Sequence, residues 1–368
     1  MKVLLLGEFS GMHQNLAIGL RKFGVDVTVA SDGDGWKNYP RDIDLSRDIK
    51  RNSFLYLLKL LRNIPNLSGY DVVQLNCPKP FNATATFNRI AFNFLKQLNK
   101  NIFLGAHGMD TRYISFALDG KLKYSVFQIP SIQNDPHIKE LRNLIKYKSE
   151  LKLNDKIASQ SKGIIASSIG YYLSYTDYFS SKTTYIPLSI DTTKYTYTST
   201  IGDNPQKIKF FLGMMEGRIV RKGTDIIHKV LLELKRRYPN DVELTIVKSV
   251  PFNEYQNLLN SSHVLCDQMY AYGIGLNGLI AQAKGLIVCG GADEEMYKAL
   301  GEQNNKPIVN INVSEDEMLK SFEFLIKNKD KLKEISIKNR AFVVKHHDSK
   351  TVANRYIEFW KEKIETTN

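Results

Sequence analysis

The chain of 368 residues has few cysteines and no long hydrophobic run. Its three cysteines, Cys77, Cys266 and Cys289, are far apart and form no CxxC pair, so neither a disulfide framework nor a zinc site is expected. No apolar stretch approaches the roughly 18 to 20 residues that cross a bilayer. The apolar run at residues 1–6 is interrupted by a Gly-Glu pair, too early for a secretory signal. We therefore expect a soluble protein that remains in the cytoplasm.

Acidic residues are scarce relative to basic ones. The chain has 51 Lys and Arg against 38 Asp and Glu, a formal net charge of +13 at pH 7. Residues 1–190 hold 25 basic and 15 acidic side chains, whereas residues 191–368 hold 26 and 23. The composition is otherwise that of a globular protein, which excludes collagen-like and disordered classes. We expect about two domains, of which the first faces an anionic partner.

Strand-like apolar runs alternate with helical patterns in the first half of the chain. Strands are expected at residues 3–6, 25–30, 72–75, 102–104 and 163–166, and helices at 13–23, 82–98 and about 138–153. Strand–helix–strand order requires parallel strands with helices on the faces of the sheet. The first half is therefore predicted to be a complete doubly wound α/β unit.

The second half repeats this order after a stretch without periodicity at residues 186–197. Strands are expected at 208–212, 242–247, 264–266 and 286–288, and helices at 224–237, 253–261, 276–283, 314–328 and 350–365. We place an N-terminal Rossmann-like domain at 1–190 and a second one at 191–350. A C-terminal helix at 351–368 could cross back to the first domain.

Two cations follow the first strand of the second half. Arg218 and Lys222 lie in the loop between the expected strand and the helix at 224. Loops at the carboxyl edge of a parallel sheet hold the ligands of such sheets. An Arg fork and a mobile Lys suit a diphosphate, although a solvated basic loop is about equally probable from charge alone.

A glycine cluster precedes the helix expected at 276. Gly273 and Gly275 would allow backbone N–H groups to approach a phosphate, yet a tight turn is the commoner explanation of such a cluster. In the first half, His107 and Asp110 flank a glycine just after a strand, where a histidine bonded to its own turn is the simpler interpretation. Gly11 lies in the loop after the first strand, and we expect His13 to be an exposed first-turn residue.

Three further motifs are interpreted as structural or left open. Asp32-Gly-Asp34 and Asp42-Ile-Asp44 imitate a metal-binding Asp-x-Asp pair, but turn formation is favoured. Residues 346–348, His-His-Asp, are expected to break a helix. Residues 47–62 form a candidate basic amphipathic helix, which would either lie on an anionic membrane or pack on the sheet.

Taken together, the motifs resemble those of the family 4 (group 1) glycosyltransferases, which have the GT-B fold. Residues 218–225, Arg-x-x-x-Lys-Gly-Thr-Asp, are similar to the family's donor-phosphate loop. Residues 105–112 are similar to its His-Gly-Ser-Asp-x-Arg turn, and residues 186–195 to its interdomain Ile-Pro element. The resemblance extends from residue 2 to about 360, and it implies two Rossmann-like doubly wound α/β domains facing a central cleft.

The resemblance also implies roles for individual residues. The catalytic residues would be His107, Asp110, Arg218 and Lys222. The substrate-binding residues would be Gly11, Arg112, Asp267, Gln268, Tyr272, Gly273, Gly275, Leu276 and Asn277. Tyr272 and Ile280 stand where the family has two glutamates, one for the donor sugar and one for the ribose. Because both cations and both glycines are present, we expect a rewired donor site rather than an inactive one.

The implied activity is that of a retaining glycosyltransferase. It would move a sugar from a nucleotide-diphosphate sugar to a glycan or lipid-linked glycan acceptor in bacterial surface polysaccharide assembly. No metal or other cofactor is expected, nor is a nucleic-acid partner, and the basic first domain would bind peripherally to the inner membrane face. The alternatives are a non-catalytic nucleotide-sugar binding protein and a GT-B nucleotide-sugar epimerase.

Overall fold

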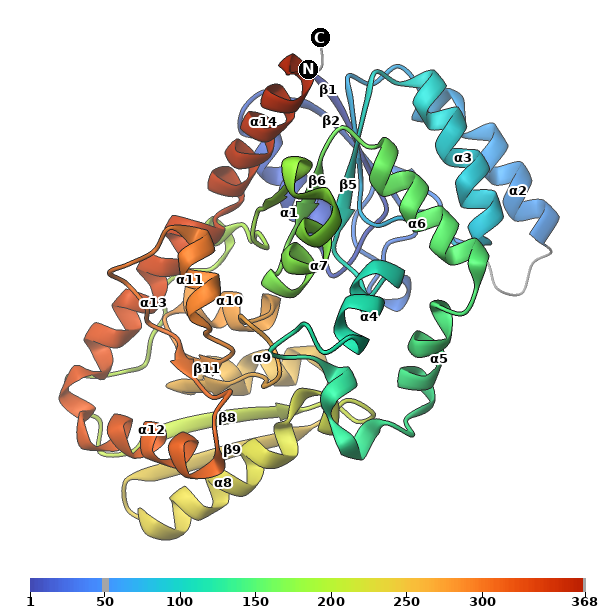
Figure 1. The fold of residues 1–368 in the computed structure, drawn as a ribbon. Helices are drawn as coiled ribbons and strands as arrows, with labels where there is room; N and C mark the ends of the chain where they lie inside the picture. Colours follow the sequence, from blue (N-terminus) through green and yellow to red (C-terminus); the bar gives the residue numbers. More distant parts are fainter. Residues whose placement is uncertain (48–52, 367–368) are drawn as a thin grey trace. The chain divides into compact units, whose positions relative to one another are not determined.

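The computed structural model describes residues 1–47 and 53–366, which fold as two compact units (Figure 1). Unit 1 consists of Met1–Leu122, Pro136–Asp191 and Ser349–Asn368. Unit 2 consists of Lys123–Asp135 and Thr192–Asp348. Each unit is built around its own parallel sheet, as expected. No helix within the described residues is long and apolar enough to cross a membrane.

Unit 1 has a seven-stranded sheet in the order β3-β2-β1-β4-β5-β6-β7, with all neighbours parallel. Its strands are β1 Lys2–Leu6, β2 Asp26–Ser31, β3 Ile43–Asp44, β4 Val72–Leu75, β5 Asn101–Ala106, β6 Ile164–Ala166 and β7 Thr183–Tyr185. In the centre, Val3 of β1 lies opposite Val27 on one side and Val72 on the other.

Helices cover both faces of this sheet. They are α1 Met12–Arg21, α2 Ser53–Arg62, α3 Ala85–Leu98, α4 Thr111–Leu118, α5 Pro136–Leu144, α6 Lys148–Gln160, α7 Ile169–Phe179 and α14 Ser349–Glu365. Val3 and Leu5 pack in a core with α1 and α14, while Leu4 and Leu6 pack in a second core with α2, α3, α6 and α7. Burial of both faces explains why β1 is a continuous apolar run.

One helix expected in this unit is two helices in the structure. The range 138–153 was predicted as a single helix, but α5 ends at Leu144 and α6 begins at Lys148. The amide of Tyr147 donates to the carbonyl of Leu144, three residues earlier rather than four. The backbone of Tyr147 itself is extended (φ −89°, ψ 107°). These conformations interrupt the helical hydrogen bonds. Of the basic helix expected at 47–62, residues 48–52 lie outside the described residues, and α2 covers Ser53–Arg62.

Unit 2 has a five-stranded parallel sheet in the order β12-β11-β10-β8-β9. Its strands are β8 Ile208–Met214, β9 Val242–Lys248, β10 Val264–Cys266, β11 Ile287–Gly290 and β12 Val309–Asn310. Its helices are α8 Thr224–Arg237, α9 Phe252–Asn260, α10 Leu276–Lys284, α11 Glu294–Leu300, α12 Glu315–Lys327 and α13 Leu332–His347. Phe210 faces the core under α8 and α12, and Phe211 faces the core under α9 and α10. The helix break expected at 346–348 is confirmed, since α13 ends at His347.

Candidate functional site

The cationic loop of unit 2 follows β8 and ends at the first residue of α8. Residues 220–222 form a single 3₁₀ turn, and Gly223 then adopts φ 64° as the N-cap of α8. A Cβ atom on Gly223 would lie 2.9 Å from the Met269 side chain, so glycine is required there for two reasons. This tight turn places Arg218 and Lys222 just beyond the carboxyl end of β8.

The two cations differ from their neighbour Arg221. Arg221 donates a hydrogen bond to the Gly217 carbonyl and so holds the loop together. Arg218 is exposed and Lys222 is half-buried, and neither has an acidic partner among the described residues. Their charge is therefore available to an anion.

A second loop, residues 267–275, lies against this cationic loop. β10 pairs directly with β8, so the segments that follow the two strands emerge side by side. The amide of Met269 donates to the Lys222 carbonyl over 2.9 Å, which ties the two loops together. The second loop leads to α10, whose N-cap Gly275 has no side-chain hydrogen bond. Backbone N–H groups at such a helix start attract anions.

Several of the expected substrate-binding residues also support this loop. The buried carboxylate of Asp267 accepts the amide of Gly275 over 3.4 Å, and the Asn277 side chain donates to the Tyr255 hydroxyl over 2.7 Å. Burial raises the pKa of Tyr255 to about 12, so this hydroxyl keeps its proton. Gly273 lies so close to Met296 that a Cβ atom would approach its sulfur to 2.7 Å. Gln268 and Leu276 are partly exposed.

Tyr272 is buried and its hydroxyl is already bonded. It accepts the amide of Lys123 over 2.8 Å, and its ring meets that of Tyr124 edge-on at 5.1 Å. The Lys123 ammonium and the Tyr124 hydroxyl both bond to the buried carboxylate of Asp293, at 2.6 and 3.0 Å. The segment Lys123–Asp135 is thus anchored to the loop 267–275 and to Asp293 in unit 2. No motif in the sequence signalled this contact.

In unit 1, Asp110 and Arg112 are held by structural contacts. Asp110 is the N-cap of α4 and accepts the amides of Arg112 and Tyr113, each at 3.0 Å. Its second oxygen accepts the Tyr175 hydroxyl over 2.6 Å. Burial raises the pKa of Asp110, and these hydrogen bonds oppose the rise. Arg112 pairs with Asp155 and stacks on Tyr178, so its charge is already engaged within unit 1.

His107 lies at the end of β5, next to residues from the first loop of the chain. Its Nδ1 donates to Asn76 over 2.8 Å, and its ring covers Gly105, where a Cβ atom would be only 2.6 Å away. The ring of His13 meets it edge-on at 6.4 Å. Burial, reinforced by His13, lowers the pKa of His107 to about 3. His107 is therefore neutral at physiological pH and can serve as a hydrogen-bonding group there.

The expectation that His13 is exposed was wrong. His13 is buried on α1, and its Nδ1 donates to the Gly7 carbonyl over 2.7 Å. The carboxylate of Glu8, which the sequence analysis did not single out, accepts the amides of His13 and Gln14 at the start of this helix. Gly11 is the N-cap of α1 with φ 77°. A Glu before a helix start is the signal that could have identified Glu8.

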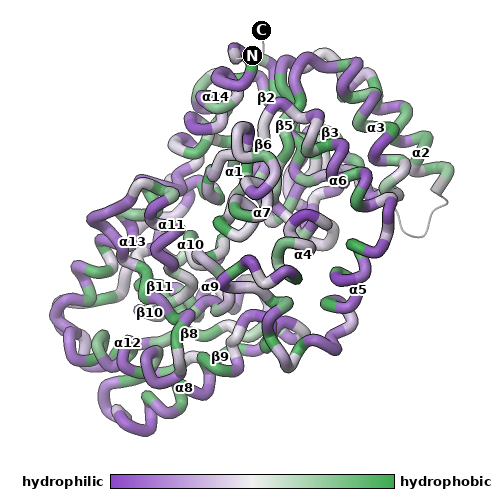
Figure 2. The backbone as a smooth tube through the Cα atoms, in the orientation of Figure 1, coloured by the Kyte–Doolittle hydropathy of each residue, from purple (hydrophilic) through white to green (hydrophobic). Residues whose placement is uncertain are grey.

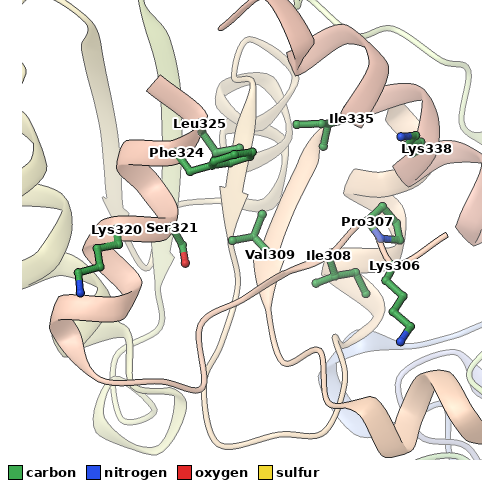
Figure 3. Close-up of a pocket in the computed structure, with 10 residues that line it drawn as sticks. All are labelled: Lys306, Pro307, Ile308, Val309, Lys320, Ser321, Phe324, Leu325, Ile335 and Lys338. Carbon is green, nitrogen blue, oxygen red and sulfur yellow. The ribbon is translucent and has the colours of Figure 1, made fainter. Parts of the chain in front are cut away.

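No expected site residue lines the pocket beside β12. This pocket of about 510 Å³ lies between β12, α12 and α13 (Figure 3). Two of its three lysines are paired, Lys306 with Glu294 and Lys338 with Glu334, so little free charge remains. Within residues 1–47 and 53–366, no three His, Cys, Asp or Glu side chains gather in a way that could hold a metal ion.

Comparison with known proteins identifies the fold. No protein-family model matches the sequence, and no curated protein is similar to it. Sucrose-phosphate synthase from Thermosynechococcus elongatus is similar in structure, with a TM-score of 0.63 and 13% identity over 100% of both chains. Anabaena HepE in complex with UDP and glucose has a TM-score of 0.60 and 14% identity, over 98% of this chain and 99% of that one.

A third similar structure is that of WaaG, a glycosyltransferase involved in lipopolysaccharide biosynthesis. It has a TM-score of 0.55 and 12% identity, and the match covers 97% of this chain and 98% of that one. At such low identity the likeness concerns the fold alone. The α/β architecture expected from the sequence is confirmed: the chain has the GT-B fold of these similar structures.

Proposed function

We propose that the protein is a glycosyltransferase whose second unit binds a nucleotide-diphosphate sugar. The observation that carries this proposal is the pair Arg218 and Lys222 on a loop that bonds to the segment 267–275, which leads to the start of α10. The hydrogen bond from Met269 to Lys222 keeps the two loops together. Two cations without acidic partners in the described chain, together with the helix N-terminus to which the bonded segment leads, suit the two phosphates of such a donor. The UDP bound by the similar protein HepE supports this reading.

The proposed reaction is the transfer of the sugar with retention of its anomeric configuration. The bond between the anomeric carbon and the diphosphate oxygen breaks, and the acceptor hydroxyl oxygen bonds to that carbon. The hydroxyl proton passes to an oxygen of the leaving diphosphate. Arg218 and Lys222 stabilise the negative charge that develops on this group, a role that metal ions have in other transferases, so we expect activity to survive EDTA.

We further propose that unit 1 presents a glycan or lipid-linked glycan acceptor. The excess of ten positive charges in residues 1–190 favours docking on the anionic inner face of a membrane. This would suit surface polysaccharide assembly, and the similarity to WaaG, which is involved in lipopolysaccharide biosynthesis, is in keeping with it.

A non-catalytic nucleotide-sugar binding protein is the second candidate. It is favoured because this chain lacks both glutamates that the resembled family has in its donor site. Tyr272 is engaged by Lys123, and Ile280 has no polar group with which to hold a ribose. Such a protein would bind a nucleotide sugar without consuming it, whereas an epimerase would convert it without an acceptor.

The experiment is calorimetric titration with a panel of nucleotide sugars, followed by turnover assays with the one that binds. Lys222→Ala should lower turnover roughly 100-fold, the effect of losing one preorganised charge. Lys229→Ala is the matched control, because Lys229 lies on α8 and pairs with Glu315 at the surface. Equal activity of the two variants would refute the role of the loop. Binding without turnover of any kind would favour the second candidate.

A further inference from the structure

Trp36 is the most exposed large apolar side chain in the described part of the chain. It is 85% exposed, and no other such side chain there exceeds 59%. It lies in the loop between β2 and β3, residues 32–42, which we call the Trp36 loop. Because β3 pairs with the last two residues of β2, this loop leaves and rejoins the sheet at its carboxyl edge, where parallel sheets hold their ligands. Hydrophobic residues follow strands such as β5 and β6 in Figure 2 and are buried there, whereas Trp36 is not.

Hydrogen bonds hold the Trp36 loop on both sides of the indole. Before it, the Asp34 carboxylate accepts the amide of Ser10 over 2.8 Å. After it, the side-chain oxygen of Asn38 accepts the Arg41 guanidinium over 2.8 Å. Asp34 and Asn38 have positive φ angles of 59° and 46°, a conformation that is uncommon outside glycine and recurs at ligand sites. The backbone around Trp36 is thus held in place before anything binds, which lowers the entropic cost of binding.

Two aromatic contacts connect the Trp36 loop to the surroundings of His107. The ring of Tyr39 lies so close to Gly11 that a Cβ atom there would be 2.8 Å from it. Phe9, in the same first loop as Gly11, lies against the glycine that follows His107, where a Cβ atom would be 3.2 Å from the ring. Trp36 therefore belongs to one connected group of loops with His107 at the carboxyl edge of the sheet.

One carboxylate of the Trp36 loop has no cationic partner. Asp34, Asp42 and Asp44 pair with Lys or Arg side chains. Asp32 forms no ion pair with any described residue. Its Oδ1 accepts the amide of Asp34 over 3.1 Å, and its Oδ2 makes no hydrogen bond within the same part of the chain. A half-buried carboxylate oxygen of this kind can accept hydrogen bonds from hydroxyl groups.

An exposed indole and an unpaired carboxylate in one loop suit a sugar. The C–H groups on one face of a sugar ring pack against the electron-rich face of an indole, and the hydroxyl groups at the edge of the ring can donate to a carboxylate. A nucleotide or an anionic lipid surface would instead bring phosphates towards an unpaired negative charge, which is unfavourable.

We propose that Trp36 stacks on an uncharged sugar ring of the acceptor and that Asp32 accepts hydrogen bonds from its hydroxyl groups. This inference rests on the proposed glycosyl transfer, and it makes Trp36 a determinant of acceptor recognition. It does not depend on which sugar the donor carries.

Tryptophan fluorescence tests this contact, because the chain has only two tryptophans and Trp360 is fully buried. Quenching by acrylamide, which is uncharged, therefore reports mainly on Trp36. The probes are maltotriose, cellotriose, mannotriose and chitotriose, each added with and without UDP. At least one should lower the quenching constant roughly twofold, and trigalacturonate, which is charged, should not. Absence of protection by all four, equal protection by trigalacturonate, or protection by UDP or phosphatidylglycerol vesicles alone would overturn the proposal.

Variants show whether the indole itself binds the sugar. In calorimetric titration with the trisaccharide that protects best, Trp36→Ala should weaken binding roughly tenfold, or about 1.4 kcal/mol, and Trp36→Phe should weaken it less. Phe324→Ala is the matched control, since Phe324 on α12 is also exposed, at 55%. Equal affinities of Trp36→Ala and Phe324→Ala would overturn the proposal. Nucleotide-sugar binding is measured in parallel: its absence from wild type would defeat the proposed function while leaving the trisaccharide results unchanged.

Discussion

Glu8, His13 and His107 are ionisable side chains that unit 1 buries at the carboxyl ends of its central strands. Burial raises the pKa of Glu8 to about 7 and lowers the pKa of His13 to about 4. Each shift reflects the cost of charge in a poorly solvated place. The shifts have opposite signs, so they give the stability of the protein opposite pH dependences.

The first prediction concerns Glu8. Its ordinary pKa is 4.5, so as pH rises from about 4.5 to about 7 the unfolded chain loses a proton that the folded protein keeps. The free energy of unfolding of the wild-type protein therefore decreases as pH rises through this window. The free energy of unfolding of Glu8→Gln, relative to wild type, should rise by up to roughly 3 kcal/mol over it and be level above pH 7. Urea denaturation at a series of pH values measures this difference.

The matched variant is His13→Gln, for which the sign reverses. The unfolded chain binds a proton below its ordinary pKa of 6.5, and the folded protein does so only near pH 4. The stability of this variant relative to wild type should fall as pH rises from about 4 to 6.5. The same slope in both variants would show that burial does not set these pKa values.

The second prediction concerns the support of His107. A Cβ atom on Gly105 would lie 2.6 Å from the His107 ring and 2.6 Å from the Leu75 carbonyl. Gly105→Ala should therefore destabilise unit 1 by roughly 1 to 3 kcal/mol, the usual cost of overpacking. Gly202→Ala is the control, since nothing lies within 4 Å of a Cβ atom there. Chemical denaturation of both variants measures this difference. Equal denaturation midpoints would contradict the tight packing of the His107 ring on Gly105.

At the scale of elements, the segment Lys123–Asp135 belongs to unit 2, although the stretches before and after it in the sequence belong to unit 1. It contains the short 3₁₀ turns Val126–Gln128 and Pro130–Ile132. Lys123 and Tyr124 bond to Tyr272, which lies in the loop 267–275 of the proposed donor site, and to Asp293. Asp293 also caps α11, and its hydrogen bonds lower its pKa against the effect of burial.

The third prediction tests this anchor. Tyr272→Phe removes the acceptor of the Lys123 amide, at a cost of roughly 1 kcal/mol. Hydrogen exchange at the start of the segment should become roughly fivefold faster, as this free energy implies. Tyr270→Phe is the control, because its hydroxyl makes no hydrogen bond within the described residues. If Tyr270→Phe speeds exchange as much as Tyr272→Phe does, the anchor is not the hydroxyl.

At the scale of the whole molecule, the chain returns to unit 1 in its last helix. The start of α14 packs so tightly on α1 that a Cβ atom on Gly19 would lie 1.9 Å from the Ser349 carbonyl. Trp360 of α14 is fully buried against Phe103, and its Nε1 donates to Gln74 of β4 over 3.2 Å. The C-terminal helix therefore supplies part of the core of unit 1.

The fourth prediction follows from this packing. Trp360→Ala should destabilise unit 1 by roughly 3 to 5 kcal/mol through loss of buried surface and the cavity that remains. The other tryptophan is the control: Trp36 is 85% exposed, and Trp36→Ala should change stability by no more than about 0.5 kcal/mol. Should the first variant not fold, Trp360→Phe provides a milder test. Similar midpoints for the Trp360 and Trp36 variants would contradict the assigned core.

Local sequence alone determined most of the strands and helices. The strand at 72–75 and the helix at 224–237 have the predicted bounds, and the parallel sheets were predicted from strand–helix alternation. These features depend on side-chain periodicity and on glycines near the ends of elements, which are properties of neighbouring residues. For the same reason, the cationic loop at Arg218 and Lys222 could be identified as a strand-to-helix connection.

Tertiary structure decided the features that depend on residues far apart in the chain. His13 is buried at the start of α1, where its ring meets that of His107 after β5, and Glu8 becomes a helix-capping carboxylate because the first loop folds back on α1. Lys123 meets Tyr272 across 149 positions of sequence. A sequence pattern shows which residues lie on the same face of one helix or in one loop. The residues that bury a side chain belong to another element, and only folding brings the two elements into contact.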